Sequence, residues 1–165
     1  AAEAGQGQAI ALPRPRKGAE DCHFSFSGLK TALAQKWKKT EDKSAPSRAD
    51  FAASLQSAIA DCLIDRTARA MKLFAKETDQ RQLVVAGGVA ANVEIGKRLR
   101  ALANELSFTV TIPPAALCTD NAAMIAWVGH EYLAQGKSDS LDFSPRPRWP
   151  LDGEALPPPG RGVRG

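Results

Sequence analysis

Apolar residues recur along the chain at two spacings, and each spacing marks a different kind of element. The apolar positions between 50 and 77 repeat at helical spacing and predict a long helix: Phe51, Leu55, Ile59, Cys62, Leu63, Met71 and Phe74. Residues 82–86 (QLVVA) form a short apolar run that ends at Gly87 and Gly88. Residues 108–112 alternate around β-branched side chains and stop at two prolines. The first segment predicts a buried parallel strand and the second predicts a further strand of the same layer.

Further elements are expected around these three. They are a short strand at 24–26, a helix over about 27–39, a loop at 40–48, a helix over about 90–105, and a helix that Thr119 or Asp120 caps and that runs to about 133. Strands that alternate with helices through short links are typical of an α/β fold with a parallel layer.

The length and the distribution of prolines suggest how the chain is divided. A chain of 165 residues is about one domain long. Residues 1–20 hold several glycines and prolines with few large apolar residues, which predicts an irregular lead-in. Residues 145–165 contain six of the eleven prolines and predict a disordered tail. We therefore expect one folded lobe over 21–144.

Charge, hydropathy and cysteine content narrow the class of protein. The net charge of +4 permits a polyanionic partner without demanding one. No apolar run approaches the roughly 18 residues that span a bilayer, and no secretory signal is visible. The three cysteines are far apart and form no CxxC pair, which is typical of reduced, buried thiols. These features predict a cytoplasmic protein without a membrane partner.

The glycine pair between the first buried strand and the following helix is the first candidate site. Gly87 and Gly88 allow a ligand to approach the backbone, and the helix behind them offers free N–H groups. Asn92, expected in the first turn of that helix, lies within reach of a sugar or a base. The alternative is a glycine turn that serves tight packing alone, and the residues by themselves leave both interpretations open.

Asp120 is the second candidate, at the start of the last helix. A carboxylate there is most simply an N-cap, and taken alone the cap is the favoured interpretation. Asp120 also follows a strand on the ligand side of the expected sheet, where it could hold a divalent cation beside a phosphate. His23 and His130 are isolated and lack a metal-ligand spacing.

Three stretches together resemble one family. Residues 24–33 (FSFSGLKTAL), 83–92 (LVVAGGVAAN) and 118–126 (CTDNAAMIA) occur in the order found in the C-terminal half of the TsaD family. Its members are tRNA N6-adenosine threonylcarbamoyltransferases, once labelled O-sialoglycoprotein endopeptidases. The resemblance covers about residues 5–145. It implies part of the second lobe of an actin-like, sugar-kinase-like ATPase fold.

The resemblance also implies roles for individual residues. Gly87 and Gly88 match the adenosine-side glycine loop, and Asn92 matches a position that contacts the adenylate-linked substrate. Asp120 matches a carboxylate ligand of a divalent metal ion, iron or zinc, which shifts its interpretation from cap to metal ligand. The implied partners are tRNA, threonylcarbamoyl-AMP, and TsaB-like and TsaE-like subunits.

The family's two histidine metal ligands lie on an HxxxH helix of the first lobe, and no such motif occurs in this sequence. Together with a start at Ala1 rather than Met, this suggests a C-terminal fragment that is inactive alone. Two rivals stay open: a sugar-kinase-like nucleotide-binding lobe, and a non-catalytic TsaB-like partner lobe. The FSFSGLKT and CTDNAAMIA stretches argue against the first, and the joint presence of Gly87, Gly88, Asn92 and Asp120 argues against the second.

Overall fold

The computed structural model describes residues 2–41 and 43–144. Within these ranges the chain divides into two compact units, the first ending at Thr119 and the second beginning at Asp120. The first unit contains, in chain order, the 3-10 helix η1 (Ala2–Ala4), α1 (Ser27–Lys39), α2 (Ala45–Glu77), β1 (Gln82–Val84), the 3-10 helix η2 (Gly88–Ala91), α3 (Val93–Glu105), β2 (Thr109–Thr111) and the 3-10 helix η3 (Ala115–Leu117). The second contains α4 (Ala122–Ala134).

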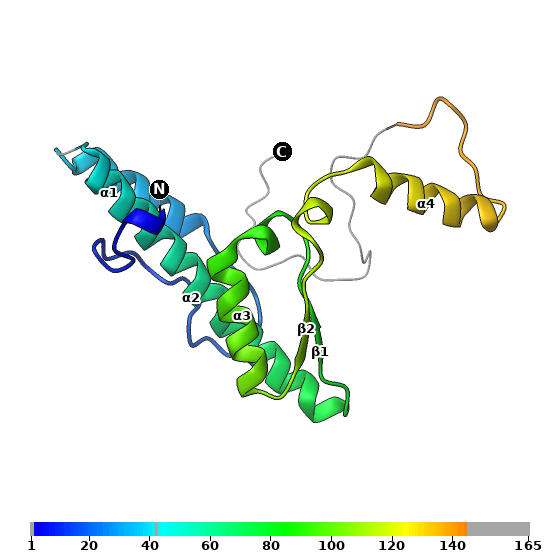
Figure 1. Ribbon diagram of the computed structural model, residues 1–165, viewed down its shortest axis with the longest axis horizontal. Helices are drawn as coiled ribbons and strands as arrows, with labels where there is room; N and C mark the ends of the chain where they lie inside the picture. Colours follow the sequence, from blue (N-terminus) through cyan, green and yellow to red (C-terminus); the bar gives the residue numbers. More distant parts are fainter. Residues whose placement is uncertain (1, 42, 145–165) are drawn as a thin grey trace. The chain divides into compact units, whose positions relative to one another are not determined.

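Helix α2 runs the length of the first unit and carries part of every buried cluster. With 33 residues it is about 50 Å long. Ala58 packs with Leu12 and Leu29, Ala60 packs with Ile95 and Leu99, and Met71 packs with Leu102, Ala103 and Phe108. The lead-in and α1 therefore cover one part of α2, while α3 and the strands cover another (Figure 1).

The sheet has the predicted parallel arrangement. β1 pairs with β2 in the register Gln82 with Thr109, Leu83 with Val110 and Val84 with Thr111, and α3 forms the crossover between them. The two strand predictions are confirmed in position, although each strand is shorter than the apolar run that indicated it. The predicted burial of the first strand was wrong, because only its middle residue is partly buried and Val84 is 67% exposed within the described chain. Both strands carry their middle residue, Leu83 or Val110, against the Met71 cluster, which fixes the face of the sheet that is covered.

The lead-in is tied to α2 by specific contacts. A Cβ added to Gly5 would lie 2.1 Å from the Ala49 carbonyl oxygen, so only glycine allows this approach. The Gln6 backbone N–H donates to the Asp50 carboxylate at 2.7 Å, and the Ile10 N–H donates to the Ser54 hydroxyl at 3.0 Å. The predicted irregular segment is thus packed along the first turns of α2.

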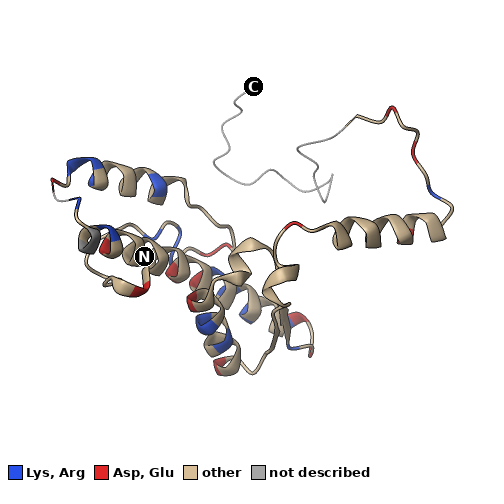
Figure 2. Cartoon of the chain, turned by 45° about the horizontal axis from the view of Figure 1, so that its top comes forward, with Lys and Arg blue, Asp and Glu red and all other residues tan. Residues whose placement is uncertain are grey.

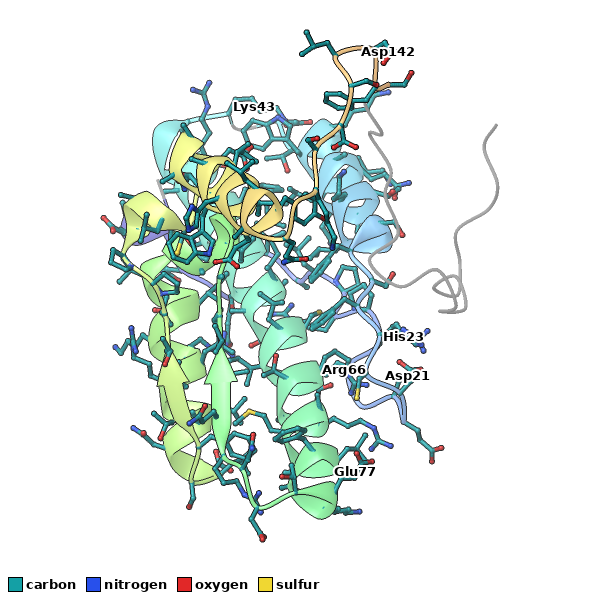
Figure 3. The ribbon with its side chains drawn as sticks, turned by 90° about the vertical axis from the view of Figure 1, so that its right-hand side faces the viewer. Asp21, His23, Lys43, Arg66, Glu77 and Asp142 are labelled. Carbon is teal, nitrogen blue, oxygen red and sulfur yellow. The ribbon has the colours of Figure 1, made fainter. Side chains whose placement is uncertain are left out.

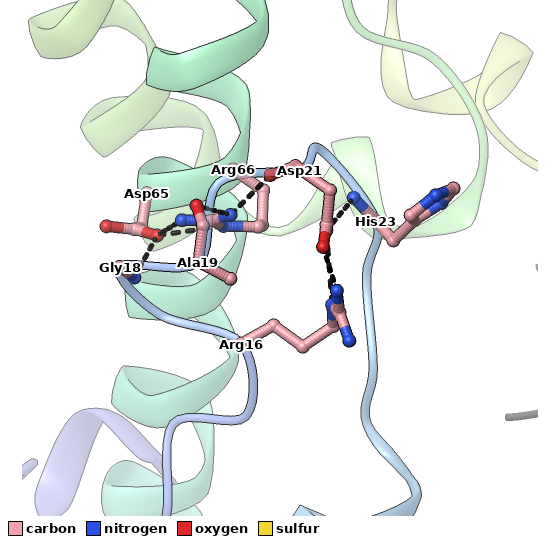
Figure 4. A network of polar contacts seen from close by, with 7 residues as sticks. All are labelled: Arg16, Gly18, Ala19, Asp21, His23, Asp65 and Arg66. Carbon is pink, nitrogen blue, oxygen red and sulfur yellow. Dashed lines mark hydrogen bonds and ion pairs between the residues drawn. The ribbon is translucent and has the colours of Figure 1, made fainter. Parts of the chain in front are cut away.

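A buried arginine, Arg66, holds the end of the lead-in against a later part of α2. Arg66 is 2% exposed, pairs with the Asp65 carboxylate and donates to the Ala19 carbonyl at 2.7 Å and to the Asp21 carbonyl (Figure 4). The Gly18 N–H donates to Asp65 at 3.0 Å. Because a buried guanidinium without acceptors would be strongly unfavourable, these bonds fix residues 18–21 on the helix.

One predicted strand and one predicted helix start were wrong. Residues 24–26 form no strand, because no neighbouring segment of the described chain pairs with them; instead Phe24 and Phe26 stack with ring centroids 6.2 Å apart. Helix α2 begins at Ala45 rather than Asp50, because the Ser44 side chain accepts the Ser47 N–H and a proline occupies the first turn, where its missing N–H is not needed.

In the described part of the second unit, residues 120–144, the chain forms one apolar helix, α4, whose residues are all exposed. Figure 2 draws it almost entirely in the colour of uncharged residues. The final helix predicted from the sequence is confirmed, but it begins at Ala122. None of the helices among residues 2–41 and 43–144 combines the length and apolar character that crossing a membrane requires. The predicted tail at 145–165 lies outside the described residues.

Candidate functional site

The glycine loop leaves the sheet at the carboxyl end of β1. Val85 still donates its N–H to the Thr111 carbonyl at 3.0 Å, after which the chain turns at Gly87 into the 3-10 helix η2. The Ala90 N–H closes the turn on the Gly87 carbonyl at 2.9 Å. A parallel strand followed by a turn and a helix places the loop where ligands of open α/β sheets bind.

The two glycines are present for different reasons. Gly87 has φ +85° and ψ 174°, a conformation that side-chain-bearing residues rarely adopt. Gly88 lies outside that region, and a Cβ built on it would meet no atom within 4 Å. The backbone conformation therefore explains the glycine at 87, while neither conformation nor packing within the described chain explains the one at 88. Tight packing, the alternative considered for this pair, does not account for Gly88.

Asn92 follows η2 as the N-cap of α3 rather than as part of its first turn. Its Oδ1 accepts the Ile95 N–H at 3.1 Å, and its backbone N–H donates to the Val89 carbonyl at 3.0 Å. Ile95 is buried at 4% exposure, so the cap anchors the end of α3 that enters the core. The amide nitrogen, which no other described residue engages, is the group that is left to donate a hydrogen bond to a ligand.

Asn92 also borders a hollow of about 540 Å³ that we call the polar hollow. Its walls come from the lead-in, from α2 and from the start of α3, and its polar members besides Asn92 are Glu3, Gln56, Ser57 and Glu94. Amide, hydroxyl and carboxylate groups of this kind suit the hydroxyls of a sugar or the N–H groups of a base. The two carboxylates disfavour a phosphate inside the hollow itself.

The segment that contains FSFSGLKT lines a different feature. Phe26, Leu29, Leu33 and Trp37 from α1 and its entry face Phe51 and Leu55 of α2 across an apolar groove of about 630 Å³, which Val89 of the glycine loop also borders. Gly28 lies in the first turn of α1, where a Cβ would again meet open space. Lys30 stands exposed on the rim of the groove.

Asp120 does not cap α4. The Asn121 side chain accepts the Met124 N–H at 3.1 Å and serves as the N-cap, so the predicted cap at Thr119 or Asp120 was wrong. Asp120 is exposed and belongs to the second unit, whereas the glycine loop and Asn92 belong to the first. Its role as a metal ligand stays a prediction.

The described residues do not form a metal site by themselves. No three His, Cys, Asp or Glu side chains gather among residues 2–41 and 43–144 in a way that could hold an ion. His130 lies against the Trp127 ring, with centroids 5.9 Å apart. His23 is an exposed loop residue (Figure 3), and its backbone N–H donates to the Asp21 carboxylate at 2.9 Å (Figure 4). One carboxylate at 120 is too few for zinc or iron, which take three or more protein ligands.

Sequence reasoning missed most of the polar hollow. No local pattern indicates Glu3, Gln56, Ser57 or Glu94, because the contacts that bring the lead-in onto α2 join residues 44 positions apart. The glycines at 5 and 7 were the one available signal, since closely spaced glycines allow an irregular segment to approach a helix. That signal is weak without knowledge of the partner helix.

Comparison with known proteins gives a consistent result. The family model for TsaD, described as tRNA N6-adenosine threonylcarbamoyltransferase, matches residues 1–127. Proteins of that name from Rhodospirillum rubrum, Sinorhizobium medicae and Novosphingobium aromaticivorans are 49%, 48% and 47% identical over 98%, 100% and 99% of this chain. The matched regions make up 46%, 47% and 45% of those relatives, so the chain spans about half their length.

Proposed function

Because the chain belongs to the TsaD family, we propose that it forms the C-terminal part of a tRNA N6-adenosine threonylcarbamoyltransferase. The observation that carries the proposal is the family match over residues 1–127, which includes the glycine loop and Asn92. The helix-rich α/β architecture with a parallel pair of strands agrees with the actin-like fold of this family. Neither a sugar kinase nor a partner lobe is favoured by these relatives.

The reaction transfers the threonylcarbamoyl group from an adenylate donor to tRNA. The exocyclic amine of an adenosine attacks the carbamoyl carbonyl, the carbon–oxygen bond to the adenylate breaks, the amine loses a proton and AMP leaves. In this proposal the first unit binds the nucleotide part of the donor. Gly88 provides open backbone for the adenylate, and the Asn92 amide nitrogen donates a hydrogen bond to it.

Asp120 contributes one carboxylate to a divalent metal ion in this proposal. The described residues lack the remaining ligands, so the chain would depend on side chains from another part of the complete enzyme. The same reasoning predicts that residues 1–165 alone show no transfer activity. TsaB-like and TsaE-like subunits would assist in tRNA modification.

A chimera tests this proposal directly. The part of the Rhodospirillum rubrum relative that precedes the matched region is joined to residues 1–165 and assayed for modified adenosine with tRNA, threonylcarbamoyl-AMP and partner subunits. We expect turnover, and its loss in Asp120→Ala but not in Asp139→Ala, which removes another exposed carboxylate of the second unit. A folded chimera that binds tRNA yet modifies none would contradict the proposal.

A further inference from the structure

A hollow on α2 concentrates positive charge on the first unit. This hollow, of about 650 Å³, lies where the lead-in meets the C-terminal half of α2, and we call it the basic hollow. Four cations and one carboxylate line it: Arg66, Arg69, Lys72, Lys76 and Asp65. The charge there is 4 − 1 = +3, against +4 for the whole chain. The polar hollow beside Asn92 carries two carboxylates and no cation, so the two hollows have opposite character.

The one carboxylate in the basic hollow is already neutralised. Partial burial raises the pKa of Asp65, but the Gly18 N–H, Arg66 and Lys17 outweigh that effect and hold the pKa below its ordinary value. Asp65 and Arg66 therefore cancel as a pair (Figure 4). Arg69, Lys72 and Lys76 form no ion pair with any described residue and leave a net charge of three.

These three cations lie on one stripe of the helix. At about 100° per residue, positions 69, 72 and 76 fall within an arc of about 60° and extend over about 10 Å. The three exposed lysines in the last turn of α1, where cations complement the helix dipole, are spread over more than about 150°: Lys36, Lys38 and Lys39. The cations on α2 therefore lie within a narrower arc than those on α1 and can face one ligand together.

Arg69 supplies a second observation. Its Nε is buried and has no hydrogen-bond partner among the described residues, although an unmatched buried donor costs about 1–3 kcal/mol. A phosphate offers two acceptor oxygens to the guanidinium fork. If the guanidinium turns outward to meet such an anion, Nε gains the partner that the folded chain does not provide.

We propose that Arg69, Lys72 and Lys76 form a docking stripe for the phosphodiester backbone of RNA. The identity of the polyanion rests on the proposed function, because the family acts on tRNA. Phosphates lie about 3.4 Å apart along the axis for each strand of a duplex, so a stripe of about 10 Å covers about three of them. The stripe provides affinity without reading sequence, as backbone contacts do.

The test measures binding of a fluorescent tRNA transcript to residues 1–165 by anisotropy between 50 and 200 mM salt. Neutralising three phosphates contributes about −2.7 to the slope of log K against log salt. This contribution weakens the binding constant about 40-fold between 50 and 200 mM salt. We expect Arg69→Gln/Lys72→Gln/Lys76→Gln to lose that contribution. The matched control Lys36→Gln/Lys38→Gln/Lys39→Gln removes equal charge from α1 and should keep most of it.

Further readouts separate the alternatives. Lys72→Gln/Lys76→Gln changes only exposed residues and should make the slope less negative by about 1.8. This variant leaves the half-buried Arg69 in place, so it shows the effect of the charges without the risk that the protein misfolds. An unchanged slope in the folded α2 variants, or an equal loss in the α1 control, would overturn the stripe. The stripe would also be overturned if the α2 variants lost binding to phosphatidylserine vesicles but kept their binding to RNA. An inactive chimera with the slope still lowered would refute the proposed function alone.

Discussion

Asn92 joins a structural role to a proposed functional role, and two substitutions separate them. Asn92→Ala removes both the Oδ1 acceptor that caps α3 and the amide nitrogen that would meet the adenylate. Asn92→Asp keeps the acceptor and places a negative charge at the helix N-terminus, where it is favourable by about 0.3–1 kcal/mol. It removes only the amide donor.

The expected magnitudes follow from the contacts. Loss of the N-cap leaves the Ile95 N–H without its acceptor beside a buried side chain and should destabilise Asn92→Ala by about 1 kcal/mol, or about 4 °C in melting temperature. Asn92→Asp should melt at or above wild type. Both should bind AMP at least about 2- to 12-fold more weakly, the loss that corresponds to one hydrogen bond of about 0.5–1.5 kcal/mol.

Thermal melting followed by circular dichroism and calorimetric titration with AMP measure the two effects separately. If Asn92→Asp binds AMP as tightly as wild type, the amide nitrogen does not touch the nucleotide and Asn92 is only a cap. If Asn92→Ala melts with wild type, the hydrogen bond to Ile95 does not stabilise α3.

Three further predictions concern the loop, an ion-pair centre and the second unit. Gly87→Ala should lower stability by about 1–3 kcal/mol because its φ and ψ lie in a region that is essentially restricted to glycine, whereas Gly88→Val should leave the melting temperature unchanged and weaken AMP binding. Asp61→Asn should cost about 1–2 kcal/mol at neutral pH, since the Asp61 carboxylate joins two arginines, and acid titration of stability should show the difference vanish. Burial raises the pKa of Asp61, but its arginine partners lower it below 3.8, so this stabilisation is present above that pH and is lost as the pH falls through the folded-state pKa. Asp120→Ala should reduce the metal content of the chimera measured by mass spectrometry, with Asp139→Ala unchanged.

The local pattern of apolar residues allowed much of the first unit to be predicted. The helical spacing over 50–77 indicated α2, and the two apolar runs indicated the parallel strands with α3 between them. These predictions succeeded because burial on one face of a helix or on a strand leaves a regular pattern in neighbouring residues. The strand expected at 24–26 failed, because a strand needs a partner, and short apolar alternation does not reveal whether a partner exists.

The caps show a finer limit. Thr119, Asp120 and Asn121 are all residues that cap helices well, and the backbone alone decides that Asn121 does so. In the same way the four residues of η2 delay the start of α3, which moves Asn92 from the first turn to the cap. The polar hollow depends on contacts between the lead-in and α2 that no local pattern encodes.

The sharing of α2 by all three buried clusters determines how the first unit can open. Amide protons near the middle of a helix exchange with solvent only when the packing on both of its sides is lost. Since Ala58, Ala60 and Met71 each belong to a different cluster, that stretch of α2 can open only if the lead-in, α1 and α3 release it together. Exchange there should report global unfolding, while η1 and the glycine loop exchange through local fluctuations. A ligand held by the glycine loop could therefore bind and leave through local fluctuations of the loop, while α2 stays packed.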